Sequence, residues 1–342
     1  MTGSDPTITF PRLVPERVQA GPQIEAAAAL NPGIEFDAGW VDRVRVNLSA
    51  AERRVETLPK RRTVKKVWQA AWLLKAVSLM DLTTLSADDT AGRVSRLCAK
   101  ARAPVRADLL DALAWGGRPL TTAAVCVYHE MVPIARAALA GTDIAIAAVS
   151  TGFPAGLSPL ELRVEEIRRS VQAGATEIDV VISRRHVLTS DWRALYAEVR
   201  AFRDACGRAH MKTILGTGQL GSIGKVAKAA LVAMMAGSDF IKTSTGMEPV
   251  NATLPVSLVM MRMIRKFTER TGYRPGFKPA GGISSAKTAL TYLMLVKEEL
   301  GNEWLVPDGF RFGASRLLGD IERQLEHYVT GRYSAAYRHP LG

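Results

Sequence analysis

Short apolar runs alternate with longer amphipathic stretches over most of the chain from residue 78 onward. The short runs are almost continuous in apolar character, which is typical of parallel strands buried on both faces. We therefore predict one strand within each of these runs: 78–85, 121–128, 143–151, 177–183, 211–218, 239–245, 276–282 and 310–315.

The stretches between these runs have the periodicity of amphipathic helices. The clearest is residues 158–174, SPLELRVEEIRRSVQAG, with an apolar stripe formed by Leu160, Val164, Ile167 and Val171. Ser158 is predicted as the N-cap, and Pro159 suits the first helical position. Glu161 completes a capping box, and Gly174 is predicted to end the helix.

Eight strand–helix units over about 250 residues predict a closed (β/α)8 TIM barrel. An open doubly wound sheet is the alternative, and it usually carries a glycine-rich loop after its first strand. In this chain the first predicted strand is followed by Ser86-Ala87-Asp88-Asp89, without a glycine. This loop favours the barrel.

The barrel is predicted to have extensions at both ends. Residues 1–37 are rich in Pro, Gly and Ala and lack clear periodicity, so we expect a loosely ordered N-terminal arm. Two helices are expected near 39–56 and 63–77. The expected segments are therefore the arm 1–37, an N-terminal helical extension 38–77, a catalytic barrel 78–330 and a C-terminal tail 331–342.

The composition is that of a soluble globular protein, with 47% hydrophobic and 23% charged residues. No run approaches the roughly 18 apolar residues of a membrane helix, and the first residues lack the pattern of a secretory signal. The three cysteines, at widely spaced positions, form neither a disulfide framework nor zinc-site spacing. We therefore expect no membrane partner and a reducing, cytoplasmic location.

The formal net charge of +12 raises the question of nucleic-acid binding. The densest basic block, residues 53–66 (RRVETLPKRRTVKK), has no interleaved aromatic residues, and no nucleic-acid motif is found. A solvated helical face in a protein with anionic substrates is the favoured interpretation, so no nucleic-acid partner is expected. The five histidines are scattered without HxxH or HExxH spacing, so no metal site is expected.

Four ionisable residues lie late in four different apolar runs: Asp81, Asp179, Lys242 and Lys278. Catalytic groups of a (β/α)8 barrel project from the C-terminal ends of its strands. Any one of the four alone could be a helix cap, an ion-pair partner or a snorkelling lysine, but four on one rim favour a functional site.

The two lysines in this set predict a particular chemistry. Partial burial and mutual repulsion both lower a lysine pKa, which frees an amine to attack a carbonyl and form a Schiff base. Asp179 is placed to move protons among these groups. Serine or cysteine hydrolysis is disfavoured, because no GxSxG elbow exists and Cys126, within AAVCVY, is interpreted as a small core residue.

Small residues after the last two predicted strands indicate an anion site. Ala280-Gly281-Gly282 follows the seventh strand, and Gly313-Ala314-Ser315 ends the eighth just before a helix. Exposed backbone N–H groups and a helix N-terminus suit a phosphate there. A tight turn is the alternative explanation for these residues.

Several of these segments together resemble one family: DFIKTSTG, GFKPAGGI, TEIDVVIS, MDLTTL, AAVCVY and GFPAG. The resemblance is to deoxyribose-phosphate aldolase, a class I, Schiff-base aldolase with a (β/α)8 fold, and it runs from about residue 40 to near 337. Residues 61–85 resemble the longer, animal-type branch. The resemblance implies reversible cleavage of 2-deoxy-D-ribose 5-phosphate to D-glyceraldehyde 3-phosphate and acetaldehyde, and no cofactor is expected.

The resemblance also implies roles for individual residues. Lys242 would carry the Schiff base, and Lys278 would lower the pKa of Lys242 and share a proton relay with Asp179. The implied substrate-binding residues are Asp81, Thr83, Cys126 and Thr245. The implied phosphate-binding residues are Gly246, Gly281, Gly282, Ser284, Gly313, Ser315 and Arg316. Short-form members use a C-terminal tyrosine in proton transfer, for which Tyr333 and Tyr337 are candidates, although this chain continues to Gly342.

The chain departs from the family pattern at the phosphate site. Met247 stands where the family has lysine, Ser284 where it has arginine, and Arg316 where it has a small residue; Gln219 replaces a common glutamate. In one hypothesis Arg316 replaces the lost cationic contact. In the other, which we favour, phosphate recognition is weakened or altered and a non-phosphorylated or differently charged aldehyde is accepted.

Other functions remain open from the sequence. A metal-dependent aldolase would need a ligand cluster that the scattered histidines do not provide. A non-catalytic barrel that binds sugar phosphates would have no need of the two lysines and Asp179. The expected partner is a small-molecule sugar phosphate or aldehyde, and a homodimer is a candidate assembly.

Overall fold

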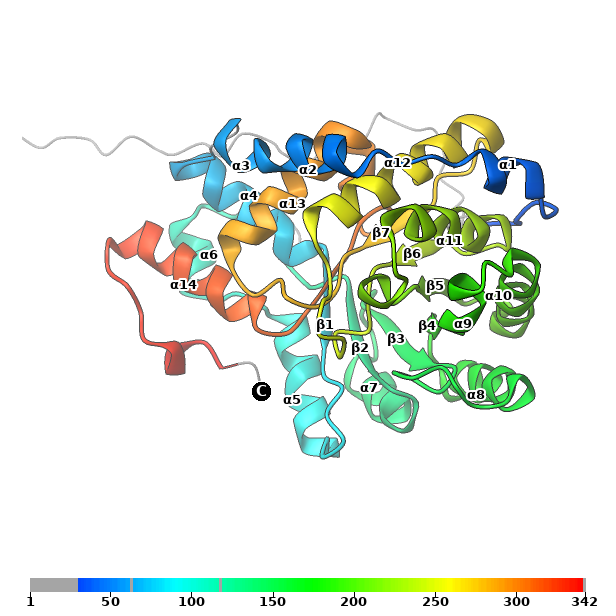
Figure 1. Ribbon diagram of the computed structural model, residues 1–342. Coiled ribbons are helices and arrows are strands. Elements are labelled where there is room, and N and C mark those ends of the chain that lie inside the picture. The colour runs from blue at the N-terminus through cyan, green and yellow to red at the C-terminus, as the bar shows by residue number, and fades with distance from the viewer. Residues whose placement is uncertain (1–29, 62–63, 117–118, 341–342) are drawn as a thin grey trace, which may run out of the picture.

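The computed structural model describes residues 30–61, 64–116 and 119–340 (Figure 1). Its strands form one eight-stranded sheet in the order β7-β6-β5-β4-β3-β2-β1-β8. All the neighbouring pairs run parallel. The strands are β1 Met80–Thr83, β2 Ala124–Tyr128, β3 Ala145–Ser150, β4 Glu177–Val181, β5 His210–Ile214, β6 Phe240–Lys242, β7 Gly276–Lys278 and β8 Phe312–Ala314.

The sheet closes between its two end strands, β7 and β8. Parallel bridges join Phe277 to Phe310 and Ala280 to Gly313. The N–H of Gly313 donates to the carbonyl of Pro279 at 3.0 Å. The predicted (β/α)8 barrel is confirmed, and every predicted apolar run coincides with one strand, although β5 begins at His210, one residue before its predicted run. Each strand is shorter than its run, because the run ends continue into loops.

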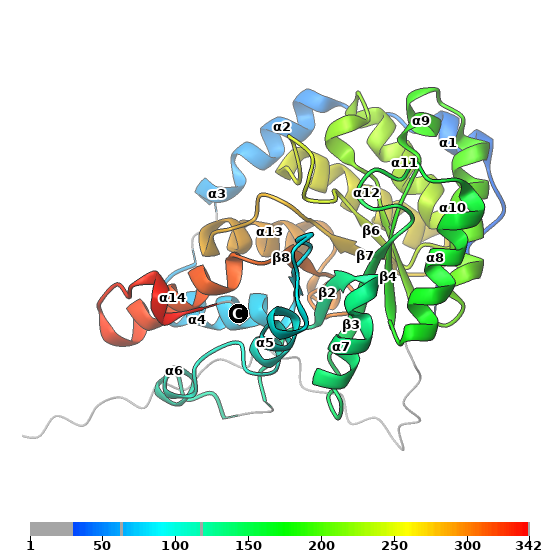
Figure 2. The ribbon, with the colours of Figure 1, turned by 90° about the horizontal axis from the view of Figure 1, so that it is seen from below.

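Helices surround the strands in Figures 1 and 2 and connect them in chain order. They are α5 Ala91–Arg102, α6 Ala107–Ala112, α7 Val132–Ala138, α8 Leu160–Ala173, α9 Arg184–Leu188, α10 Trp192–Cys206, α11 Ile223–Met235, α12 Leu254–Thr271, α13 Ala286–Glu299 and α14 Leu317–Thr330. Short 3-10 turns lie at η1 His129–Met131, η2 Thr217–Gln219, η3 Asn302–Trp304 and η4 Ala336–Arg338.

Helix α8 differs from its prediction at its first turn. Pro159 is the N-cap, with a non-helical ψ of 145° and no side-chain cap bond, so Ser158 lies too early to cap the helix. Leu160 is exposed, and the buried face includes Arg163, which pairs with Glu198 of α10 at 2.7 Å. Gly174 ends the helix in the left-handed conformation, as predicted.

The N-terminal extension has more helices than the two that were predicted: α1 Ala38–Arg43, α2 Leu48–Glu56, α3 Leu58–Arg61 and α4 Lys66–Ser78. The predicted helix 39–56 is interrupted after Arg43, because Val44 is extended and the side chain of Asn47 caps a new helix. Figure 1 shows these helices along the outside of the barrel, where α2 contacts α12 and α4 contacts α13 and α14.

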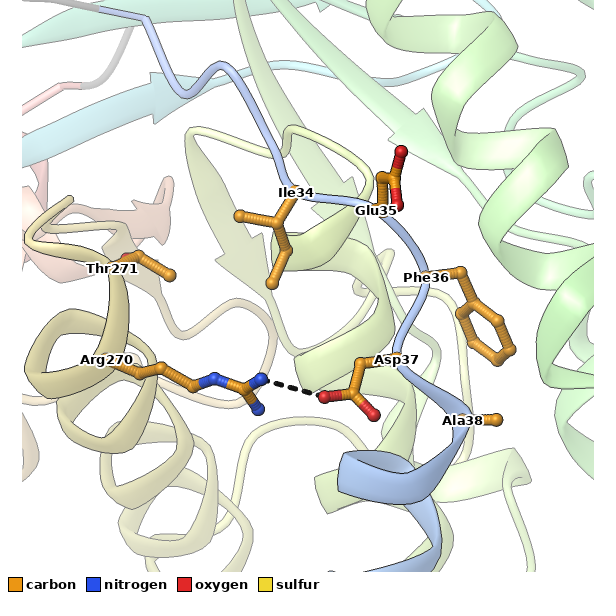
Figure 3. Close-up of a pocket in the computed structure, with 7 residues that line it drawn as sticks. All are labelled: Ile34, Glu35, Phe36, Asp37, Ala38, Arg270 and Thr271. Atoms are coloured by element: carbon orange, nitrogen blue, oxygen red, sulfur yellow. Dashed lines mark hydrogen bonds and ion pairs between the residues drawn. The ribbon is translucent and has the colours of Figure 1, made fainter.

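Residues 30–37, predicted as part of a loosely ordered arm, are anchored on the barrel; residues 1–29 of that arm lie outside the described residues. Asn31 is buried, and its amide donates to the carbonyls of Met234 and Ser238. Asp37 pairs with Arg270 at 2.8 Å (Figure 3). Within the described ranges, no helix is long and apolar enough to span a bilayer.

Candidate active site

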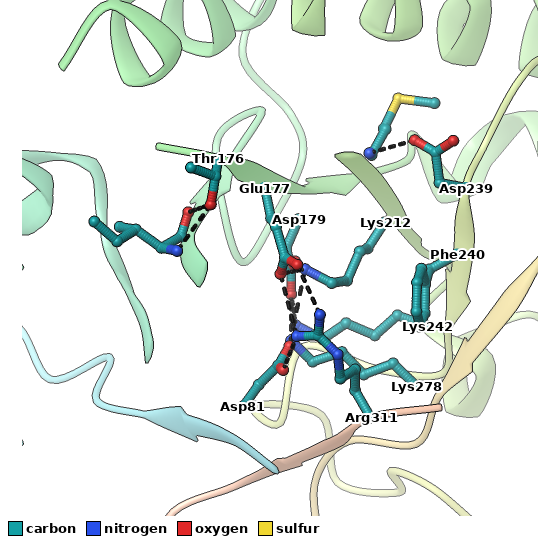
Figure 4. A network of polar contacts seen from close by, with 12 residues as sticks. Asp81, Thr176, Glu177, Asp179, Lys212, Asp239, Phe240, Lys242, Lys278 and Arg311 are labelled. Carbon is teal, nitrogen blue, oxygen red and sulfur yellow. Dashed lines mark hydrogen bonds and ion pairs between the residues drawn. The ribbon is translucent and has the colours of Figure 1, made fainter. Parts of the chain in front are cut away.

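The four ionisable residues singled out in the sequence meet inside the barrel (Figure 4). Asp81, Asp179 and Lys278 are fully buried, and Lys242 is 3% exposed. Asp179 lies at the centre: its Oδ2 accepts hydrogen bonds from Lys242 Nζ at 2.7 Å and Lys278 Nζ at 2.8 Å. Strand register explains the meeting of the two lysines, because Lys242 of β6 lies directly opposite Lys278 of β7.

Lys278 bridges two carboxylates. Besides its bond to Asp179, its Nζ donates to Asp81 Oδ2 at 2.5 Å. Gly313 of β8 makes room for this side chain, since a Cβ at that position would lie 3.1 Å from Lys278 Cε and 2.8 Å from Ala280 Cβ. The site therefore joins β1, β4, β6 and β7, with β8 supplying the space.

A second group of charges lies beside these residues and was missed from the sequence: Glu177, Lys212 and Arg311. Lys212 Nζ contacts Glu177 and donates to Asp179 Oδ1 at 3.1 Å. Arg311 donates to Asp81 Oδ1 at 2.6 Å and to Glu177 Oε1 at 2.8 Å. All three lie at the start of their predicted apolar runs, whereas catalytic groups were expected late in those runs. The spacing of Glu177 and Asp179, two apart and so on one strand face, was the available signal.

The two lysines titrate in opposite directions. Burial lowers the pKa of Lys242 and the charge of Lys278 adds to the effect, although Asp179 opposes both. Burial alone would also lower the pKa of Lys278, but Asp179 and Asp81 raise it well above its ordinary value. The prediction that both lysine pKa values fall is therefore wrong for Lys278, because it has a second carboxylate. Lys242 loses its proton more readily, and Lys278 holds its proton.

Asp179 stays ionised despite its complete burial. Desolvation alone would raise its pKa, but Lys212, Lys242 and Lys278 together hold the pKa well below its ordinary value. A carboxylate held between two lysines in this way can relay a proton from one to the other.

The predicted substrate-binding residues Cys126 and Thr83 lie on the adjoining strands. Cys126 is buried with Ala147 and Val149 in a small apolar cluster. Burial raises the pKa of its thiol, which is consistent with a packing residue rather than a nucleophile. The Thr83 hydroxyl donates to the carbonyl of Asp81 at 2.8 Å.

Thr245, Gly246 and Met247 form the loop that follows the lysine of β6. The carboxylate of Glu248 accepts hydrogen bonds from the N–H and hydroxyl of Thr245 and from the N–H of Gly246. Gly246 has a φ of 91°, which only glycine adopts readily. The Met247 side chain is 55% exposed.

The other predicted phosphate residues lie after β7 and β8. Gly281 and Gly282 both have a φ of 79°. Ser284, Ser315 and Arg316 are exposed. Arg316 is the N-cap of α14 and gives it no side-chain cap bond. Gly313 differs from this group, because its N–H is already donated to Pro279 within the closed sheet.

The candidate tyrosines of the tail point to solvent, with Tyr333 73% and Tyr337 83% exposed. His339, which is buried, pairs with Glu326 of α14 at 2.8 Å and holds the tail there. Over residues 30–61, 64–116 and 119–340, no group of three or more His, Cys, Asp or Glu side chains is arranged to hold a metal ion.

Comparisons with known proteins identify the family of the chain. Residues 75–310 match the model of the DeoC/LacD family of aldolases. The chain is 61% identical over 311 residues to deoxyribose-phosphate aldolase from Mus musculus, covering 90% of this chain and 98% of that protein. It is 60% identical over 316 residues to the Homo sapiens protein of that name, covering 92% and 99%.

Among solved structures, a putative deoxyribose-phosphate aldolase from Toxoplasma gondii superposes with a TM-score of 0.65 at 19% identity. The match covers 80% of this chain and all of that chain, 100%. At this identity the likeness shows a shared fold.

Proposed function

This chain belongs to the DeoC/LacD family of aldolases, and on that premise we propose that it cleaves 2-deoxy-D-ribose 5-phosphate reversibly to D-glyceraldehyde 3-phosphate and acetaldehyde through a Schiff base on Lys242. The relatives from Mus musculus and Homo sapiens, named deoxyribose-phosphate aldolase, support the substrate. The observation that carries the mechanism is the shared contact of Lys242 and Lys278 with one oxygen of Asp179.

The proposed reaction begins at Lys242. Its lowered pKa makes the neutral amine accessible, and the amine adds to the C1 aldehyde of the open-chain sugar. Lys278, held protonated, supplies the proton with which the C1 hydroxyl leaves as water, giving the iminium. Asp179 lies between the two nitrogens and relays the proton that Lys242 releases to the C1 oxygen, which thereby becomes the hydroxyl. Loss of water then leaves the Lys278 amine neutral.

Bond cleavage uses the iminium as an electron sink. The neutral Lys278 amine accepts the C3 hydroxyl proton, the C2–C3 bond breaks, and the electron pair of that bond moves into the iminium to form an enamine. Glyceraldehyde 3-phosphate leaves with the former C3 as its aldehyde carbon. Protonation of C2 and hydrolysis then release acetaldehyde and regenerate the Lys242 amine. In the condensation direction the same steps run backwards.

We further propose that phosphate recognition is altered. The exposed Met247 and Ser284 offer no cation, while the exposed Arg316 stands at the N-terminus of α14. A cationic side chain beside a helix N-terminus favours binding of an anion such as a phosphate group. An aldolase of this mechanism that prefers non-phosphorylated aldehydes is the second candidate. The predicted cytoplasmic location and homodimer stay predictions.

Borohydride trapping with acetaldehyde tests the mechanism. We expect mass spectrometry to find a reduced two-carbon adduct on Lys242 and none in Lys242→Met. Treatment with EDTA should leave cleavage of deoxyribose 5-phosphate unchanged. If the folded wild type forms no adduct, the Schiff-base mechanism fails and a non-catalytic sugar-phosphate-binding barrel takes its place.

A further inference from the structure

Arg184, the first residue of α9, joins loops that follow several different strands. Its guanidinium donates to the carbonyl of Ala155 at 2.8 Å and to that of Pro154 at 3.1 Å, both in the loop after β3. It also lies over Gly216, after β5, where a Cβ would be 2.5 Å from Arg184 Nε. The side chain is only 15% exposed. Such a fork of donors is specific to arginine.

The same guanidinium reaches the loop that follows Lys242. Arg184 Nη2 lies 3.6 Å from Glu248 Oε1, and the Glu248 side chain is 2% exposed. Glu248 in turn binds the N–H groups of Thr245 and Gly246 at 3.0 and 3.2 Å. A buried carboxylate with one guanidinium beside it depends on that partner for its charge balance.

The contacts continue from this loop to the predicted phosphate site. Asn251 donates to the carbonyl of Glu248 at 2.8 Å. Its side chain also packs on Gly281, where a Cβ would lie 2.5 Å from Asn251 Cγ. The loop carrying Glu248 is therefore held by Arg184 on one side and lies against Gly281 on the other.

We propose that Arg184 is a positioning residue, which acts through Glu248 to hold the loop 243–252 in the conformation that presents Thr245 to the substrate and keeps Asn251 against Gly281. This rests on the proposed function for the identity of the substrate. Arg184 does not touch the reacting atoms. Arg184 keeps the loop ordered, and the ordered loop raises the affinity for the substrate.

Hydrogen exchange of the free enzyme tests the first half of the proposal. We expect Arg184→Met to accelerate amide exchange in peptides covering 243–252, because the bonds from Thr245 and Gly246 to Glu248 open more often. Arg185→Met is the matched control: the charge change is the same and the neighbouring side chain is exposed. Equal exchange in the two variants would overturn the proposal, whatever the wild type cleaves.

Kinetics test the second half. For deoxyribose 5-phosphate, we expect KM to rise about tenfold in Arg184→Met with kcat changed less than about threefold. Arg184→Lys should lie between this variant and the wild type, and Lys242 should still trap acetaldehyde. The double variant Arg184→Met with Glu248→Gln should be no worse than Glu248→Gln alone, because Arg184 acts through Glu248.

The outcomes separate this proposal from the proposed function. A wild type that does not cleave deoxyribose 5-phosphate contradicts the proposed function, while exchange still decides whether Arg184 holds the loop. A wild type that cleaves it, with KM unchanged in Arg184→Met, overturns the positioning role alone. Multiplicative effects in the double variant would show that the two residues act separately and would also overturn it.

Discussion

Lys242 and Lys278 donate to the same oxygen of Asp179, at 2.7 and 2.8 Å, from directly opposed positions on β6 and β7. The two lysines nevertheless differ in pKa, because Lys278 also donates to a second carboxylate, Asp81, and Lys242 does not. One nitrogen is therefore suited to attack and the other to hold a proton. The next two predictions follow from this inequality.

Replacing Lys278 by methionine should slow cleavage by about 10²–10⁴-fold, because the proton donor is lost. The positive charge that lowers the pKa of Lys242 is lost too, so trapping of acetaldehyde should need a higher pH than in the wild type. Trapping measured from pH 6 to 10 checks the shift. Lys287→Met, at an exposed position, is the control, and a trapping profile unchanged in Lys278→Met would contradict the assigned role.

Replacing Asp179 by asparagine should move the same profile the other way. The Asp179 charge raises the pKa of Lys242, so its removal lowers that pKa and trapping should extend to lower pH. Turnover should nevertheless fall by about 10²-fold or more, because no carboxylate relays the proton. Asp204→Asn, at a site 64% exposed, is the control. A shift to higher pH would mean that Asp179 is not the dominant negative charge near Lys242.

The sequence was sufficient to predict that Asp81, Asp179, Lys242 and Lys278 lie together, because parallel strands of a barrel bring their later residues to one end. Their catalytic roles stay predictions. The sequence was not sufficient to predict Arg311. The contacts of Arg311 with Asp81 and Glu177 exist only after β8 pairs with β1, and this pairing is not visible in local spacing.

The direction in which the Lys278 pKa shifts could not be predicted from the sequence for a related reason. Two nearby lysines are expected to lower the pKa of each other, but a carboxylate within hydrogen-bond distance raises the pKa of the lysine it contacts. Distances between strands decide that balance. The hydrogen bond from the Gly313 N–H to the carbonyl of Pro279 likewise forms only when the barrel closes, and the assignment of Gly313 to phosphate stays a prediction.

The buried carboxylates make stability fall in acid. Charges of neighbouring lysines and Arg311 hold the pKa values of Asp179, Glu177 and Asp81 below their ordinary values, against the effect of burial. Their stabilisation is complete above the unfolded pKa of about 4 and is lost as pH falls further. We expect urea midpoints to be flat from pH 7 to about 5 and to drop steeply below about 4.

Glu177→Gln tests the origin of that drop. The variant leaves Lys212 and Arg311 with one carboxylate fewer, so at pH 7 it should lose about 3–5 kcal/mol of unfolding free energy. Its stability should also depend less on pH below about 5, because one depressed carboxyl is gone. An exposed carboxyl variant, Asp204→Asn, at a site 64% exposed, should keep the wild-type slope. An unchanged slope in Glu177→Gln would place the acid sensitivity elsewhere.

Substrate preference depends on the exposed residues around the mouth of the barrel. Met247→Lys with Ser284→Arg adds two cations where the family pattern has them, and each charge-assisted contact contributes about 1.5 kcal/mol or more. We expect kcat/KM for deoxyribose 5-phosphate to rise about a hundredfold, with that for deoxyribose unchanged. The single variant Arg316→Ala measures how much Arg316 contributes to phosphate binding in the wild type. The contrary result is a wild type that already favours the phosphorylated sugar by several orders of magnitude, with that preference abolished by Arg316→Ala. In that case Arg316 has replaced the lost cations, and phosphate recognition is relocated rather than weakened.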